Sequence, residues 1–333
     1  MSEVPDWLVS IIQQAGGWIS FERFMAEALY DTEHGYYQVN VSAIGRDGDF
    51  STSGTLTQAF GEAIAHWASN RARTLFPDND FCLIEVGAGS GDLARSLQAS
   101  WSLVSDRPWR YQAVETSQRL GEQLSAMGFQ VETSLSTALR SCGGRALIIS
   151  NELPDAFPAR QLIWQHGDWQ EVGVELRDGR LVEVFVPFRD AVDAEALSEP
   201  REGQRLFVHP HYHHWLRTEL AGWDRGSMLT IDYGAVSPSF ECRAYREQQR
   251  QEGDAVYAMP GSQDITCDVN FSDLRRWGED LGLSTQLSVA QWEFLEDWLP
   301  NATERAKSDE ALQFVMYPFG AGGAFRVLEQ QRQ

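Results

Sequence analysis

Lysine is nearly missing from this chain. Lys307 is the only lysine among 333 residues, so 26 of the 27 basic residues are arginines. Acidic residues number 48, and the formal net charge is −21. Such a charge repels phosphate backbones and anionic lipid surfaces, which argues against nucleic acid as a partner. It remains compatible with a basic peptide or protein.

Long apolar runs and targeting signals are also missing. No apolar stretch reaches the 18 or more residues that a membrane span needs, so we expect no membrane insertion. The N-terminus, "MSEVPDWLVSIIQQAGG", carries an acid near its start and lacks the basic region of a leader. We therefore expect a cytoplasmic protein with no segment to be removed.

Cysteine is sparse and shows no metal-binding spacing. The four cysteines lie far apart, without a CxxC pair: Cys82, Cys142, Cys242 and Cys267. This predicts buried free thiols in a reducing compartment. The histidine-rich "HPHYHHW" lacks a cysteine or carboxylate at ligand spacing, and "QDITCDVNF" lacks the glycine and final glutamate of an EF-hand. We predict no metal site and a solvated helix start at the histidines.

What is present from residue 81 onward is an α/β pattern. "FCLIEV", "RYQAVE", "FQVE", "RALIIS" and "SMLTIDYG" read as buried strands, with helical stretches alternating among the first four. Near-continuous apolar strands of this kind predict a parallel sheet covered on both faces. Further helices are expected at "FSDLRRWGEDLG" and "SVAQWEFLEDWL", followed by a hairpin that ends the chain.

Two regions outside this core show other sequence patterns. Residues 1–80 look helical, with one apolar face in "SFERFMAEALY" capped by Ser20, and a second helix from about Thr57 to Leu75. Residues 158–225 contain three β-like runs separated by Gly-Asp and Asp-Gly turns, which predicts an antiparallel insertion. We therefore expect a core made of residues 81–157 and 226–333.

A glycine loop joins the first core strand to its helix. Its glycines are Gly87, Gly89 and Gly91. Small residues there allow a tight turn and a close approach to a ligand at the helix N-terminus. Asp92 stands where a nicotinamide-binding loop needs its third glycine. Glu85 at the strand end is instead typical of S-adenosylmethionine (SAM) enzymes, and Glu115 after the next strand can accept ribose hydroxyls.

The motifs "GDFSTSGTLTQAFGEAIAHW", "IEVGAGSGDLA", "SNELPDAFPARQ", "LTIDYG" and "PGSQDITCDVNF" follow one another in this order. With them the chain resembles the MidA family of class I SAM-dependent methyltransferases, whose mitochondrial members methylate an arginine of a respiratory complex I subunit. The resemblance runs from about Ser20 to Val327. It implies a Rossmann-like core, a helical N-terminal extension, an inserted β-rich substrate lobe, SAM as cofactor and a protein or peptide arginine as acceptor.

The resemblance also implies site residues. SAM is expected to be held by Gly87, Gly89, Gly91 and Glu115. The cofactor or acceptor site is expected to be bordered by Asp49, Phe50 and Thr52, and the adenine by Ser134 and Leu135. Asn151, Glu152 and Asp155 match the family's Asn-Glu-x-x-Asp signature. We expect Glu152 to orient a guanidinium nitrogen by a charge-assisted hydrogen bond, with Asp155 as second clamp and Asn151 holding the loop or the acceptor. Alternatively, Asn151 and Asp155 only satisfy backbone groups in an Asx-type turn.

The sequence departs from the family pattern close to the expected acceptor site. Gly54 and Thr55 stand where the family usually has Pro-Glu, and Gln248 or Gln249 where it often has histidine. The acceptor therefore stays open, as do mono- against dimethylation and a homodimeric state. The alternatives are an N- or O-methyltransferase of a small molecule or peptide, a SAM-binding assembly factor without turnover and, more remotely, a Rossmann oxidoreductase.

Overall fold

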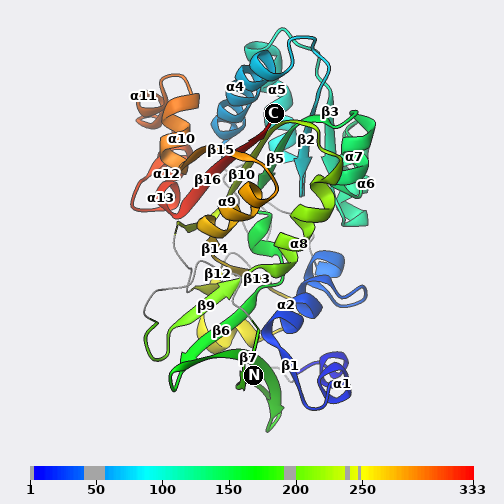
Figure 1. Cartoon of the computed structure of the whole chain (residues 1–333), viewed down its shortest axis with the longest axis vertical. Helices are drawn as coiled ribbons and strands as arrows, with labels where there is room; N and C mark the ends of the chain where they lie inside the picture. Colours follow the sequence, from blue (N-terminus) through cyan, green and yellow to red (C-terminus); the bar gives the residue numbers. More distant parts are fainter. Residues whose placement is uncertain (1–3, 41–56, 191–199, 237–240, 247–248) are drawn as a thin grey trace.

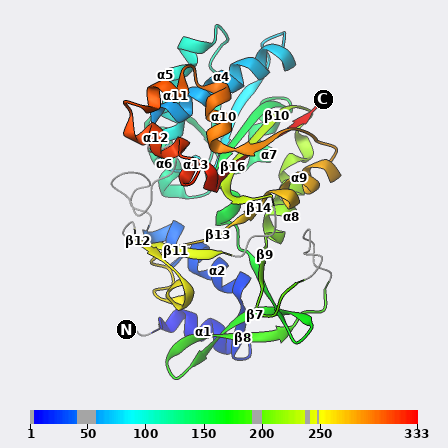
Figure 2. The ribbon, with the colours of Figure 1, turned by 90° about the vertical axis from the view of Figure 1, so that its left-hand side faces the viewer.

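A computed structural model of the 333-residue chain describes residues 4–40, 57–190, 200–236, 241–246 and 249–333. Figures 1 and 2 show two lobes, a large one built around a twisted sheet with helices on both faces and a smaller β-rich one. The N-terminus lies in the small lobe and the C-terminus in the large lobe (Figure 1).

The large lobe contains an eight-stranded sheet in the order β15-β16-β10-β5-β2-β3-β4, with β14 paired to β10. Its parallel strands are β2 (Cys82–Val86), β3 (Tyr111–Val114), β4 (Gln130–Glu132), β5 (Arg145–Asn151), β10 (Arg225–Ala235) and β14 (Val269–Asn270). The antiparallel strands are β15 (Ser284–Ala290) and β16 (Phe325–Arg332). The predicted parallel core is confirmed. Chain order reverses at β2, so a crevice opens between the carboxyl ends of β2 and β5.

Helices bury both faces of this sheet, as the continuous apolar strands predict. One apolar cluster includes Phe60 of α4 (Gln58–Leu75), Leu97 of α5 (Asp92–Val104) and Phe294 of α10 (Gln291–Trp298). The other cluster includes residues of α7 (Leu135–Ser141), α8 (Pro210–Glu219) and α9 (Phe271–Asp280). Along β2, Leu83 joins the first cluster and Ile84 the second, which is the two-residue alternation of a strand.

The small lobe combines segments that are distant in sequence. One sheet has the order β1-β7-β6-β9 with β8 on β7, and the other has the order β12-β11-β13. Their bounds are β1 (Trp18–Ser20), β6 (Arg160–Gln165), β7 (Asp168–Arg177), β8 (Arg180–Pro187), β9 (Arg205–Val208), β11 (Cys242–Arg246), β12 (Gln249–Gln251) and β13 (Asp264–Cys267). Helices α1 (Asp6–Gln14) and α2 (Phe21–Tyr30) pack here, and the predicted Ser20 cap accepts a hydrogen bond from Arg23 N at 3.1 Å.

The lobe boundaries differ from those expected at 80, 158 and 226. Helix α4 packs on the core sheet through apolar residues such as Phe60 and Trp67, and α8 does the same through Tyr212 and Leu216. Strand β1 instead pairs with β7, and β11 to β13 join the small lobe. Each lobe is therefore completed by segments from both sides of the insertion.

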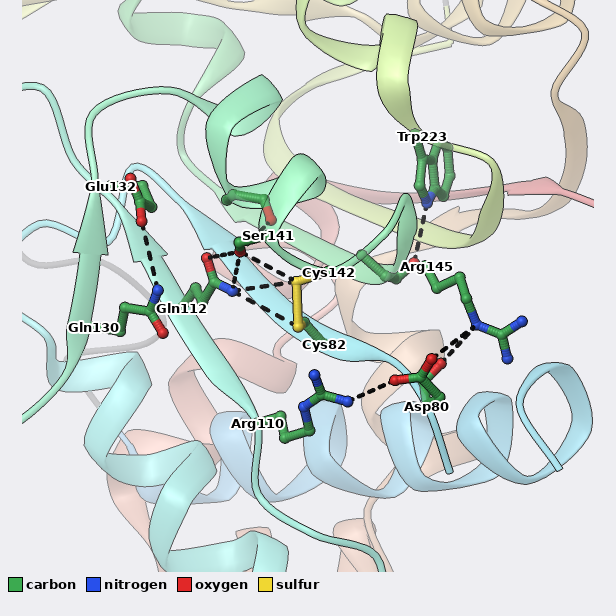
Figure 3. The surroundings of a disulfide bond; sticks show 12 residues. Asp80, Cys82, Arg110, Gln112, Gln130, Glu132, Ser141, Cys142, Arg145 and Trp223 are labelled. Carbon is green, nitrogen blue, oxygen red and sulfur yellow. Dashed lines mark hydrogen bonds and ion pairs between the residues drawn. A yellow bond between two sulfur atoms is a disulfide. The ribbon is translucent and has the colours of Figure 1, made fainter. Parts of the chain in front are cut away.

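Two further expectations were wrong. β15 and β16 pair antiparallel, but they are no hairpin, because α10, α11 (Ala302–Ala306), α12 (Glu310–Met316) and α13 (Ala321–Ala324) lie between them. Cys82 and Cys142 form a disulfide, with Cα atoms 5.9 Å apart, where free thiols were expected (Figure 3). The fold places Cys82 at the start of β2 beside the end of α7, which the 60-residue sequence separation concealed. Cys242 and Cys267 are free thiols.

Within the described ranges, no helix has both the length and the apolar character required to cross a bilayer.

Candidate functional site

The glycine loop leaves β2 in conformations that favour glycine. Gly87, Gly89 and Gly91 have φ angles of 72°, 55° and 79°. Gly91 precedes the first turn of α5, and a Cβ there would come within 2.7 Å of Leu124 Cδ2. The loop is thus fixed by backbone conformation and by close packing, and it directs the N-terminus of α5 toward the crevice.

Glu115 secures this loop from the neighbouring strand. Its Oε2 accepts a hydrogen bond from Gly89 N at 2.9 Å, and its Oε1 accepts one from Ser117 N at 2.8 Å. Burial raises the pKa of Glu115, while these backbone hydrogen bonds act in the opposite direction. Since each carboxylate oxygen has two lone pairs, the group can hold the loop and still accept ligand hydroxyls.

Glu85, at the end of β2, is more deeply buried. Its Oε2 accepts a hydrogen bond from the Tyr111 hydroxyl at 2.6 Å. Burial is the main influence and raises the pKa of Glu85 to about 8, against the lowering effect of Tyr111. In the ligand-free protein this carboxyl therefore holds a proton near neutral pH.

These residues line one cavity at the carboxyl ends of β2, β3 and β5. Its empty space, including the open mouth, is about 880 Å³. Four carboxyl groups face it, and among the described residues that line it there is no lysine, arginine or histidine: Glu85, Asp92, Glu115 and Glu152 are the acids. The carboxylates among them, which do not include the protonated Glu85, suit a ligand with a sulfonium and an ammonium group. They oppose the pyrophosphate of a dinucleotide, for which positive groups are the usual partners.

The N-terminal segment closes one side of the cavity. Tyr30, from the end of α2, and Tyr37 and Gln38, from the π-helical turn η1 (Tyr36–Asn40), line it. The Tyr30 hydroxyl donates to the Ala156 carbonyl at 2.7 Å, and the Tyr37 hydroxyl donates to Asp264 Oδ1 at 2.8 Å. The sequence analysis did not predict these residues. The paired tyrosines of "HGYYQ" were the one available signal, and π-helical turns occur often at functional sites.

Asn151 and Glu152 reach the same cavity from the end of β5. Glu152 has a φ of 54°, which is uncommon for a residue with a side chain and indicates local strain. Its Oε1 accepts a hydrogen bond from Asn151 Nδ2 at 3.0 Å. Asn151 Oδ1 is buried and has no hydrogen-bond partner within the described parts of the chain. An acid and a buried acceptor thus stand beside the glycine loop.

The chain matches a known protein family over most of its length. A family model described as S-adenosyl-L-methionine-dependent methyltransferase matches residues 63–289. The chain belongs to this family. It is a SAM-dependent methyltransferase, as predicted, and SAM is its methyl donor.

Relatives and solved structures extend the match over nearly the whole methyltransferase. This chain is 28% identical to the mitochondrial protein arginine methyltransferase NDUFAF7 homolog of Drosophila melanogaster. The alignment spans 300 residues and covers 80% of this chain and 68% of that protein. The Homo sapiens protein arginine methyltransferase NDUFAF7 is 26% identical over 299 residues, covering 79% and 66%. A Burkholderia thailandensis crystal structure bound to S-adenosyl-homocysteine has a TM-score of 0.80 and 26% identity, covering 98% and 91%. The Rossmann-like methyltransferase fold is confirmed.

Asp155 lies apart from the other two signature residues. It is only 7% exposed, does not line the cavity, and its Oδ2 accepts a hydrogen bond from the Thr266 hydroxyl at 2.7 Å. Burial raises the pKa of Asp155 to about 6, against the lowering effects of that hydrogen bond and the Arg243 charge. This position favours the structural interpretation of Asp155 over the second clamp.

The remaining expected cofactor residues are not brought to the cavity, or lie outside the described residues. Ser134 caps α7 by accepting a hydrogen bond from Thr137 N, and Leu135 is buried in the core. Neither lines the cavity. Asp49, Phe50 and Thr52 fall outside the described residues, as do the departures from the family pattern at Gly54 and Thr55.

The histidine cluster has structural roles. His209 is buried, which lowers its pKa to about 4, His211 Nε2 lies 2.9 Å from Glu22 Oε1, and His213 stacks on the Trp277 ring. A solvated helix start was therefore wrong for His209 and His213. Within the described residues, no three potential ligands gather into a group that could hold a metal ion.

Proposed function

We propose that this methyltransferase transfers the methyl group of SAM to an arginine guanidinium of a protein substrate. The observation that carries the proposal is the placement of Glu152 in the cofactor cavity, beside the glycine loop. The names of the relatives from Drosophila melanogaster and Homo sapiens, which are protein arginine methyltransferases, support the acceptor type. The net charge of −21 suits a basic protein partner.

Glu152 supplies what this reaction needs from the protein. SAM provides an electrophilic methyl on a sulfonium, so the N–CH₃ bond forms as the S–CH₃ bond breaks. An arginine is protonated at neutral pH, and a carboxylate orients one of its nitrogens through a charge-assisted hydrogen bond. The same carboxylate stabilises the positive charge that builds up as the nitrogen attacks, until a guanidinium proton is lost to solvent.

Asn151 orients Glu152 and completes the polar site. Its Nδ2 donates to Glu152 Oε1, which restricts the rotation of the carboxylate. Its buried Oδ1 is available to accept from the guanidinium or from the ammonium of the cofactor. Oriented in this way, Glu152 holds the acceptor nitrogen in line with the methyl carbon, which is the main requirement of the displacement.

Replacing Glu152 with glutamine tests the proposal. Glu152→Gln keeps the size of the side chain and removes its charge, so kcat should fall by about 100-fold or more, as for loss of one electrostatic stabiliser. Methylation is measured at saturating labelled SAM, and cofactor binding by calorimetry. The control is Glu304→Gln, since that side chain is 74% exposed in α11. Activity of Glu152→Gln close to wild type would falsify the guanidinium clamp.

Acceptor class is tested with a protein extract from a strain lacking this chain. Incubation with the enzyme and labelled SAM should place the label on arginine in one protein band. Label confined to small molecules would support the small-molecule alternative. Tight SAM binding without any transfer would support an assembly factor. Cytoplasmic location and a homodimer stay predictions, checked by cell fractionation and light scattering.

A further inference from the structure

Residues of β10 and β13 hold the Asn151–Asp155 turn that follows β5. β10 runs parallel to β5 and pairs Ile231 with Asn151, so its next residue, Asp232, lies beside this turn. β13 contributes Thr266 from the small lobe. Asp232 is fully buried and does not line the cofactor cavity.

Hydrogen bonds from these strands fix both sides of Glu152. On the near side, Glu152 N donates to the Ile231 carbonyl at 2.8 Å. On the far side, Asp155 N donates to Asp232 Oδ2 at 3.0 Å. The other oxygen of Asp232 accepts from Tyr233 N at 2.7 Å, so the carboxyl group itself is held. Thr266 then binds the Asp155 side chain at 2.7 Å.

This arrangement explains how Glu152 keeps its positive φ. A non-glycine residue in that region costs about 1–3 kcal/mol and persists only when its surroundings over-determine it. Here the turn is anchored at Glu152 N by Ile231 and at Asp155 N by Asp232, and both of these β10 residues are buried. If the far anchor were lost, the backbone could relax to negative φ and turn the Glu152 side chain away from its position in the cavity.

We propose that Asp232, together with Thr266, is a positioning residue for methyl transfer, because it holds Asp155 and so keeps Glu152 facing the acceptor. The inference rests on the proposed role of Glu152. It gives a role to the "LTIDYG" and "QDITCDVNF" motifs, which the cofactor site leaves without one. Burial also raises the pKa of both Asp155 and Asp232, and the charge of Asp155 raises that of Asp232 further.

The test compares Asp232→Ala with Asp232→Asn, which keeps one oxygen for Asp155 N. Initial rates use labelled SAM and the protein extract described above, and binding uses S-adenosylhomocysteine. Asp232→Ala should lower kcat by up to about 100-fold, since small misplacements far from the chemistry can have that effect. Its KM for SAM and its binding of S-adenosylhomocysteine should stay within about threefold of wild type, and Asp232→Asn should recover most of the rate.

A matched control removes the same kind of bond elsewhere. Asp309 Oδ1 accepts from Leu312 N at 3.0 Å as the cap of α12, so Asp309→Ala should leave the rate unchanged. If Asp232→Ala does not fold, Thr266→Val takes its place. That variant should lose rate, and Thr266→Ser should restore it. Wild-type kcat in folded Asp232→Ala or in Thr266→Val would overturn the inference.

The double variant separates this inference from the proposed function. If Asp232 acts through Glu152, Asp232→Ala should have little further effect in a Glu152→Gln background. An inactive Glu152→Gln with fully additive losses in the double variant would refute positioning and leave the Glu152 clamp intact. Wild-type activity in Glu152→Gln would reject both.

Discussion

Glu85 and Glu115 lie at the ends of neighbouring strands and line one cavity, yet they accept hydrogen bonds from different kinds of donor. Glu115 receives two backbone N–H groups, whereas the hydrogen bond at Glu85 comes from one tyrosine hydroxyl in a fully buried setting. Burial therefore raises the pKa of Glu85 to about 8. The residue type alone predicts two carboxylates, and only the packing reveals that one of them holds a proton.

The protonation of Glu85 predicts a specific dependence of stability on pH. Its pKa is about 8 in the folded protein and about 4.5 when exposed, so between these values the folded state keeps a proton that the unfolded state has lost. The free energy of unfolding should therefore decrease with rising pH, by about 1.4 kcal/mol per unit from this group.

Glu85→Gln should remove this contribution, because glutamine resembles the protonated acid. The difference in unfolding free energy between variant and wild type should grow steadily in favour of the variant from pH 5 to pH 8. Urea unfolding at three pH values measures it. Parallel pH dependences for the two proteins would contradict a raised pKa at Glu85.

At the scale of elements, the glycine loop depends on the packing of α5 against α6 (Gln118–Ala126). Gly91 and Gly128 both have positive φ, but a Cβ at Gly91 would meet Leu124 at 2.7 Å, whereas one at Gly128 would meet nothing within 4 Å. Alanine substitutions at these two positions therefore distinguish the effect of backbone strain, which both share, from the effect of close packing, which only Gly91 has.

Gly91→Ala should be more destabilising than Gly128→Ala. Both changes place a side chain at positive φ, which costs about 1–2 kcal/mol. Gly91→Ala adds overpacking, typically about 1–3 kcal/mol, and should also weaken SAM binding because the loop must shift. Denaturant unfolding and calorimetry measure the two effects. Equal stability losses would show that α6 does not constrain the loop.

Elements with strong periodicity could be predicted from the sequence, and others could not. The apolar face of α2 and the apolar run of β5 determine those elements locally. Helices α11 to α13 are four to seven residues long, too short to show a period. Strands β11 to β13 are three to five residues long and pair with one another, so their sequence carries little strand signal. Of the expected site, the glycine loop, Glu115, Asn151 and Glu152 were found by motif, whereas Tyr30 and Tyr37 depend on how the extension folds over the core.

At the scale of the whole molecule, the disulfide links the chain at the amino ends of the two central strands, β2 and β5, whereas the cavity lies at their carboxyl ends. Cys82 starts β2, and Cys142 shortly precedes β5. Figure 3 shows Gln112 and Ser141 beside the two sulfur atoms, with Gln112 Nε2 3.2 Å from Cys142 Sγ.

Counting thiols tests this bond. Protein unfolded without a reductant should show two reactive thiols, Cys242 and Cys267, and four after reduction. Reduction should also lower stability by about 2–4 kcal/mol, the usual range for a native disulfide. Alkylation followed by mass spectrometry counts the thiols. Four labelled cysteines in unreduced protein, purified with its thiols protected from air, would show that the bond is absent in the cell.

The carboxyl-lined cavity has a consequence for turnover. SAM enters with a positive sulfonium, and its by-product S-adenosylhomocysteine is an uncharged thioether at the same atom. A cavity that presents acids and, among its described lining residues, no basic side chain attracts the first more strongly than the second. The chemical step thus removes one of the charges by which the cofactor was held. Loss of that charge weakens the electrostatic attraction between the cavity and the by-product, which favours product release.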